Sequence, residues 1–168
     1  KFDNTGTIIW GTYFGGSNFD LIRSVCTHQN EIYFTGLTNS TDLPVTFGAV
    51  QPINFGQFDS FISRFDTNGL MVWNTYYGGS NDEDARQIIY NHNSNTVYVS
   101  GYTNSSNFYI FDAYQPFYGG NTDAFLVSLN NLGGLDQSTY YGSIGNDRAF
   151  TVCDAPNGDI YVGGETES

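Results

Sequence analysis

The sequence has few basic residues and no long apolar run. Five Lys and Arg residues stand against 17 Asp and Glu residues, which gives a formal net charge of −12 at pH 7. Nucleic acids and anionic membrane surfaces bind proteins through clustered Lys and Arg, so we expect neither as a partner. No apolar run exceeds four residues, as at 70–73, so we expect no helical membrane insertion.

Cysteine is also scarce, with only Cys26 and Cys153 in the chain. Two cysteines are too few for a disulfide framework, and they lack the CxxC spacing of redox and metal sites. They occupy equivalent places in the repeat described below, two copies apart, where a separation beyond the ~7 Å Cα limit for a disulfide is expected. We predict that both are buried and pack as small apolar residues.

A leader segment is absent at the start of the sequence, which begins at Lys1 without a charged stretch followed by an apolar one. We therefore expect either that a leader was removed or that the chain is an excised piece of a longer protein. What the sequence does contain is 20 Gly and 17% aromatic residues. This aromatic content is typical of a folded chain and excludes general disorder.

The sequence repeats itself with a step of 63 or 64 residues, which gives about 2.6 copies. We place them at 1–64, 65–128 and 129–168 of a single domain. Several landmarks keep the same step through the copies: 12–15 with 75–78 and 139–142, 32–36 with 97–101 and 160–164, and Gln51-Pro52 with Gln115-Pro116. The third copy departs at Gln137, which stands where the earlier copies have Trp10 and Trp73.

Each copy is expected to contain four strands, which in the second copy are 61–65, 70–77, 85–90 and 97–100. Asp66 begins a turn in which its carboxylate caps a backbone N–H and a later Gly takes positive φ. No stretch shows the 3.6-residue period of a capped helix. Because several strands are apolar on both faces, we predict an all-β fold. Its antiparallel four-stranded sheets would stack like the blades of a β-propeller.

The motifs at 123–125, 75–80, 97–105 and 113–116 resemble the bacterial β-propeller repeat often called the SBBP repeat. The resemblance covers nearly the whole chain. It implies a part of a large secreted or cell-surface protein, frequently from Bacteroidetes, in which such repeats accompany adhesion modules and signals for type IX secretion. It implies little about activity.

A propeller closes with about 4–8 blades, so 2.6 copies indicate a segment of a larger ring. The remaining blades are expected from the same longer chain. Two alternatives stay open: several copies of the chain assemble into one ring, or a different partner chain completes it.

The densest acidic cluster is the candidate metal site, because Ca²⁺ binds several carboxylate and carbonyl oxygens. Its residues are Asp82, Glu83 and Asp84. The spacing is not that of an EF-hand loop, and only the middle acid recurs, as Asp20 and Asp147. We therefore favour a structural role for this position, either capping a turn or pairing with the arginines three residues further on. No cofactor is expected.

Aromatic residues fall into a recurrent set and a loop set. The recurrent set, which includes Trp10 with Trp73, and Tyr33 with Tyr98, is expected to pack between the sheets. The loop set offers the candidate ligand contacts, and a glycan would be its ligand: Phe108, Tyr109, Phe117 and Tyr118. The alternative for these four residues is packing within their own loop.

No catalytic constellation is present, and the chain is not expected to be an enzyme. His28 and His92 fall in equivalent turns but do not recur in the third copy, which favours a polar turn role over catalysis. We predict a non-catalytic structural or interaction scaffold of a secreted or cell-surface bacterial protein, in adhesion, surface assembly or motility. The alternative is a carbohydrate-binding or carbohydrate-active propeller protein with its site in the channel or loops.

Overall fold

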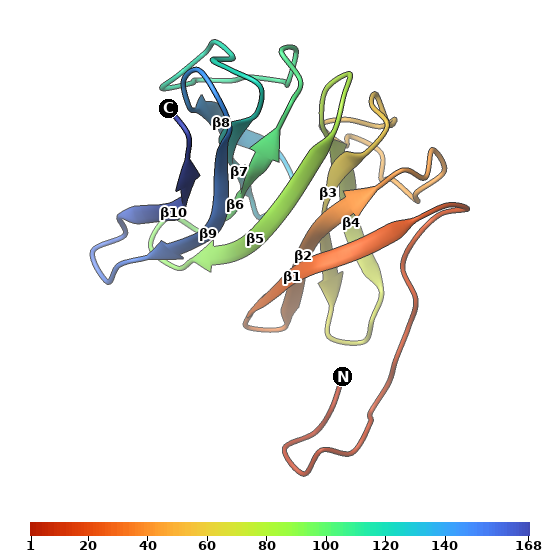
Figure 1. Cartoon of the computed structure of the whole chain (residues 1–168). Coiled ribbons are helices and arrows are strands. Elements are labelled where there is room, and N and C mark those ends of the chain that lie inside the picture. Colours follow the sequence, from red (N-terminus) through yellow and green to blue (C-terminus); the bar gives the residue numbers. More distant parts are fainter.

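The computed structural model describes residues 1–168 and contains ten β-strands and no helix (Figure 1). The all-β prediction is confirmed. The structure contains no helix that could span a membrane. The strands form two four-stranded antiparallel sheets, with the orders β1-β2-β3-β4 and β5-β6-β7-β8, and a two-stranded sheet, β9-β10. Their bounds are β1 Asp20–His28, β2 Glu31–Thr38, β3 Asp59–Asp66, β4 Met71–Tyr77, β5 Glu83–Asn91, β6 Thr96–Thr103, β7 Asp123–Asn130, β8 Leu135–Tyr141, β9 Asp147–Asp154 and β10 Ile160–Thr166.

The sheets are out of phase with the sequence copies. The four strands expected in the second copy are divided between two sheets, because β3 and β4 complete the first sheet whereas β5 and β6 begin the second. The long loop 39–58 returns the chain so that β3 runs antiparallel beside β2, with Thr38 opposite Asp59. The segment around Gly78 and Gly79 then leads from the edge strand β4 into the next sheet.

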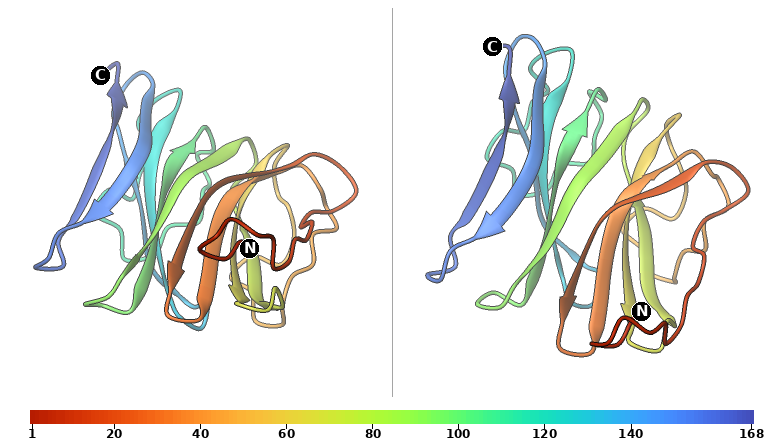
Figure 2. Two further views of the ribbon diagram at one scale, coloured as in Figure 1. Left: turned by 90° about the horizontal axis from the view of Figure 1, so that it is seen from below. Right: turned by 60° about the horizontal axis from the view of Figure 1, so that its bottom comes forward.

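The three sheets lie side by side, face against face (Figure 2). β5 packs against β1, β2 and β3, and β9 packs against β5, β6 and β7. The main core fills the first junction with side chains from both sheets, among them Tyr33, Ile62, Trp73 and Tyr77 on one side and Ile88, Val99, Val127 and Leu129 on the other. The middle sheet is therefore covered on the face toward the first sheet and, over β5 to β7, on the face toward β9, as its apolar strands predicted.

Burial at one repeat position depends on whether a neighbouring sheet covers it. Val25 is exposed, whereas its equivalents Ile88 and Val152 are buried against the preceding sheet. The next position faces the opposite way: Cys26 is half-buried beside the second sheet, and Cys153 is exposed on the uncovered side of the third. The prediction that both cysteines are buried is therefore wrong for Cys153, because no sheet covers that face.

We expect the two free thiols to react at very different rates with a thiol-specific reagent. Cys153 is exposed and should label at once. Burial raises the pKa of Cys26 to about 12, so its thiolate is scarce and its access to reagent is restricted. Mass spectrometry of timed samples of native protein measures both rates, and equal rates would contradict the stacking of the first two sheets. A Cys153→Ser variant isolates the slow reaction.

A β-bulge recurs at one place in the first strand of every sheet. The register shifts past Arg23 in β1, past Arg86 in β5 and past Phe150 in β9, which leaves one extra residue there. A glycine lies opposite each bulge because the backbone of the bulged strand comes too close for a side chain. At Gly101, a Cβ atom would overlap the Asp84 carbonyl oxygen and lie 2.6 Å from Cζ of Phe125.

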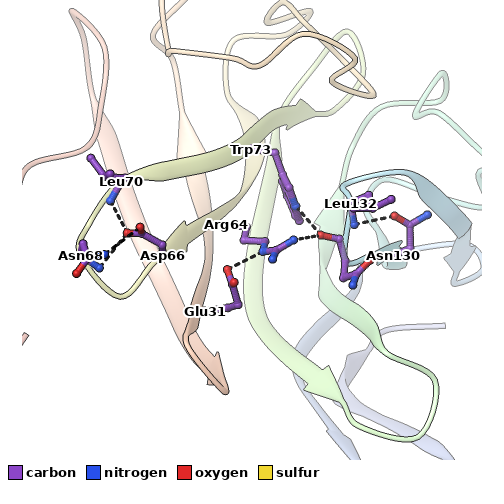
Figure 3. Close-up of polar contacts among 9 residues, drawn as sticks. Glu31, Arg64, Asp66, Asn68, Leu70, Trp73, Asn130 and Leu132 are labelled. Carbon is purple, nitrogen blue, oxygen red and sulfur yellow. Dashed lines mark hydrogen bonds and ion pairs between the residues drawn. The ribbon is translucent and has the colours of Figure 1, made fainter.

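The turn between β3 and β4 has the predicted chemistry. Asp66 Oδ1 accepts hydrogen bonds from the backbone N–H groups of Asn68 and Leu70, each at 2.9 Å, and Gly69 has φ of +85° (Figure 3). The turn after β7 is built alike, with Asn130 in the place of the Asp and Gly133 at φ +85°. An Asx side chain followed by Gly thus fixes the turn in each copy.

The turn after β7 also links the second sheet to the first. The indole Nε1 of Trp73 donates to the Asn131 carbonyl at 3.0 Å, and Arg64 donates to the same oxygen (Figure 3). The Nε of Arg64 also donates to the Glu31 carboxylate, at 2.7 Å. Trp10 repeats the contact one copy earlier by donating to the Thr67 carbonyl at 2.9 Å. The recurrent Trp thus contacts the turn of the next copy, and at Trp73 this contact joins two sheets.

A buried tyrosine fixes each long loop to its sheet. The Tyr76 hydroxyl donates to the Ser40 carbonyl at 2.9 Å and accepts from the Leu43 N–H at 2.8 Å. In the next copy, the Tyr140 hydroxyl makes the corresponding bonds with Ser105 and Phe108, at 2.9 and 3.1 Å. The loops therefore hold a defined position over the ends of the strands.

Candidate functional site

Two buried carboxylates approach each other where the first two sheets join. Asp59, at the start of β3, and Glu83, at the start of β5, both border Gly78, where an added Cβ would lie 2.7 Å from the Asp59 carboxyl carbon. The next junction repeats the arrangement, because Asp123 and Asp147 border Gly142 in the same way. A glycine is needed at this position because the two carboxyl groups occupy the space of a side chain.

Glu83 closes the Gly-rich turn that leads into its own sheet. Its carboxylate accepts from the Gly79 N–H at 2.7 Å and from the Thr103 hydroxyl at 2.5 Å. Asp20 accepts from Gly16 N–H, and Asp147 from Ser143 N–H, both at 2.8 Å. The predicted role of this recurring acid as a turn cap is confirmed. The predicted pairing with arginine is wrong, because its side chain points to the turn.

Asp59 performs the matching role for the long loop. It accepts from the backbone N–H groups of Phe55 and Gly56, at 3.0 and 2.9 Å, and from the Gln51 side-chain amide at 2.5 Å. The other end of that amide accepts from Gly78 N–H at 2.8 Å, so Gln51 connects the two sides of the junction. The recurrence of Gln51 and Asp59 in the sequence marked both positions, but it did not indicate that the two side chains contact each other.

Burial perturbs both carboxyl groups. It raises the pKa of Asp59 to about 6 and the pKa of Glu83 to about 7, and the charge of Asp59 adds to the rise at Glu83. Paired carboxyls with raised pKa values are typical of acid–base catalysis as well as of structural networks. Here the protein's own donors engage both groups and the pairing recurs at the second junction, which favours the structural role.

We expect the free energy of unfolding to fall as the pH rises from about 5 to 8. At pH values between the ordinary pKa of Glu and about 7, Glu83 binds more protons in the folded protein than in the unfolded chain. Raising the pH through this range therefore lowers the free energy of unfolding. The loss is on the order of 3 kcal/mol. Urea titrations across this pH range measure it.

Glu83→Gln should make that pH profile less steep, since it removes one of the two titrating groups and leaves Asp59, and Asp136→Asn at an exposed position of β8 is the matched control. Two results would contradict the account: stability that rises with pH over this range, or equal slopes in the wild type and the Glu83→Gln variant.

The candidate metal ligands do not converge. Asp84 accepts from Arg23 at 2.8 and 3.0 Å, from Arg86 at 3.0 Å and from the Tyr102 hydroxyl at 3.1 Å. Asp82 accepts from the Phe58 N–H at 3.2 Å near the surface. Glu83 accepts hydrogen bonds from its own turn and from Thr103, so the three neighbouring carboxylates make separate contacts. No group of three or more His, Cys, Asp and Glu residues in the chain is placed to bind a metal ion.

The four loop aromatics divide between core and surface. Phe108 is only 3% exposed and packs against Tyr77 and Phe125, with ring centroids 5.0 and 4.9 Å away, so it is not available to a ligand at the surface. Tyr118 is half-buried against Tyr140, whereas Tyr109 and Phe117 are exposed. Two of the four residues therefore pack against the strands of the core and not within their own loop, and two remain as candidate contacts.

A hollow with a volume of about 880 Å³ lies between the second and third sheets. The outer strands β7 and β8 form one wall, and β10 forms another. Apolar and polar groups share the lining, among them Leu126, Thr139, Tyr141, Val162 and Gly164. No family model and no curated protein matches the sequence.

His28 and His92 are not part of this hollow. They lie at the turns after β1 and β5, where the His28 ring stacks on Tyr90 at 4.0 Å between centroids and lies 4.7 Å from the His92 ring. The ends of the first two sheets thus contact each other through aromatic packing, which the polar turn role predicted for the two histidines did not include.

Proposed function

We propose that the chain is a β-propeller segment that serves as a non-catalytic scaffold in a secreted or cell-surface bacterial protein. The observation that carries the proposal is that its recurrent polar and aromatic side chains join neighbouring sheets and loops. Trp73 bonds to the next turn, Tyr76 holds a long loop, and Asp59 and Glu83 close the junction. Such contacts give rigidity, which a display surface requires.

The long loops would provide the interaction surface of this scaffold. Tyr109, Tyr114 and Phe117 are exposed on loop 104–122, whose base is held by buried residues such as Phe108. Loops on a rigid framework are the usual place for binding residues. The type of repeat that the sequence resembles supports a surface location, in adhesion, surface assembly or motility, and export by type IX secretion.

A protease-shaving experiment on intact cells of the source organism tests the location. We expect protease added outside the cells to release peptides of the chain, while a cytoplasmic marker stays intact. Loss of these peptides when type IX secretion is blocked would add the export route. Protection of the chain until the cells are lysed would overturn the proposal.

Exposed aromatic residues also favour one second candidate, a carbohydrate-binding role, because sugars stack on such rings. A glycan array with the wild-type protein and a Tyr114→Ser/Phe117→Ser variant separates the two. We expect no array signal that depends on these residues. Hits that the double variant loses would replace the scaffold with a glycan-binding function. Equal melting temperatures of the two proteins serve as the control for folding.

A further inference from the structure

The third sheet differs from the other two along one edge. β10 pairs only with β9, whereas its equivalents β2 and β6 are paired on both sides. The second partner of those strands is β3 or β7, which begins a β-hairpin. The N–H and C=O groups along the free edge of β10 are therefore available to pair with another strand.

Side chains beside this edge are exposed where their equivalents are buried. Val162 on β10 is 45% exposed, whereas its equivalent Val99 on β6 is fully buried. Tyr141, at the end of β8, is 66% exposed, whereas its equivalent Tyr77 is 1% exposed. Because these residue types match, the difference in exposure comes from what covers each side chain.

The occupied junction shows what that partner supplies. There, one face of the β7–β8 hairpin packs Phe125, Val127, Leu129 and Tyr140 into the core shared with the first sheet. The loop before the hairpin covers Tyr77, whose hydroxyl donates a hydrogen bond to the Tyr109 carbonyl at 2.7 Å. The hollow lies at the corresponding place beside β10, with Leu126 and Tyr141 on its wall.

The free edge also has the space that a large aromatic residue needs. In the second sheet, the Phe125 ring lies over Gly101, the residue paired with it across the strands. Gly164 has the equivalent place on β10 and also lines the hollow. A hairpin with Phe at the matching position could therefore approach β10 as β7 approaches β6.

We propose that the free edge of β10 and the hollow together bind a β-hairpin with the residue pattern of β7–β8. Its first strand pairs with β10 by strand addition, and its apolar face fills the hollow with residues equivalent to Phe125, Val127 and Leu129. The inference rests on the repetition within the chain and not on the proposed location or role. If no hairpin binds, the proposed scaffold role is unaffected, and if the scaffold role is wrong, this proposal is unaffected.

A synthetic peptide of residues 121–143, which contains the β7–β8 hairpin, tests the proposal. We expect saturable binding of the labelled peptide by fluorescence anisotropy. Bound peptide should slow hydrogen exchange of β10 amides about tenfold or more, with β1 unaffected. Absence of saturation at about 100 μM protein, or binding without protection of β10, would overturn the proposal. The peptide with Ser at positions 125, 127 and 129 is the control and should not bind.

Two variants of the protein locate the binding. Val162→Lys places a charge on the side of β10 that faces the hollow and should weaken binding about tenfold or more. Tyr161→Lys places the same charge on the opposite side, beside the exposed Cys153, and should leave binding unchanged. Both positions are exposed in the free protein, so both variants should fold. Equal weakening by the two variants would contradict the proposed site.

Discussion

Replacing Gly101 with Ala is expected to prevent stable folding. The added Cβ would overlap the Asp84 carbonyl oxygen and lie 2.8 Å from the Ala85 Cα, within the bulge of the neighbouring strand. Both contacts are with backbone, so neither is relieved by a change of side-chain rotamer. We expect a loss above about 4 kcal/mol, seen as insoluble protein or a collapsed near-UV circular dichroism signal.

The matched control is Gly11→Ala. Gly11 has no neighbouring atom within 4 Å of an added Cβ, and its backbone is not in the left-handed region. Its free energy of unfolding should stay within about 0.5 kcal/mol of the wild type. A Gly101→Ala protein as stable as the Gly11→Ala protein would show that the β5–β6 bulge does not have the geometry described.

Trp73→Ala is expected to cost about 3–5 kcal/mol. The side chain is buried between the sheets, and its Nε1–H satisfies the Asn131 carbonyl at 3.0 Å. Truncation leaves a cavity and removes one of the two donors to this carbonyl, the other being Arg64, and it also removes the packing over Gly133. For a chain of this size, the melting temperature should fall by about 10 °C, which calorimetry measures.

Trp10→Ala separates the local contact from the stacking of whole sheets. Trp10 makes the same type of bond, to the Thr67 carbonyl, but it is only half-buried and belongs to a segment outside the named strands. We expect a loss of about 1 kcal/mol. An equal loss in the two variants would mean that the indole contact alone accounts for the effect and that burial between sheets adds nothing.

The repeat made most of the secondary structure predictable. Aromatic and β-branched residues indicated the strands of the second copy, and the Asx-to-Gly spacing at 66–69 predicted the turn that the structure contains. The expectation of four strands in every copy was wrong for the first copy, in which 7–14, the equivalent of β4, forms no strand. These features depend on neighbours in sequence, which recur with the copies. Sheet membership was less accessible, because it depends on which edge the long loop reaches, and that follows from tertiary contacts such as those of Gln51 and Tyr76.

Burial and site geometry were predictable only in part. Recurrence marked Tyr33 and Tyr161 as equivalent core residues, yet the first is buried and the second exposed, because a sheet covers only the first. Sequence patterns describe what a residue prefers, not whether a neighbour is present. The same reason explains Phe108, which lies in a polar loop but packs into the core, and Asp59, whose partner Glu83 comes from the next sheet.

The offset between copies and sheets determines where the gene can be divided. A cut between residues 64 and 65 passes through β3, and one between 128 and 129 passes through β7. Cuts in the Gly-rich connections at 78–82 and 142–146 would instead separate whole four-stranded units. Recombination within those connections would add or delete one complete sheet, so the length of such an array can change over evolution without breaking a single strand pair.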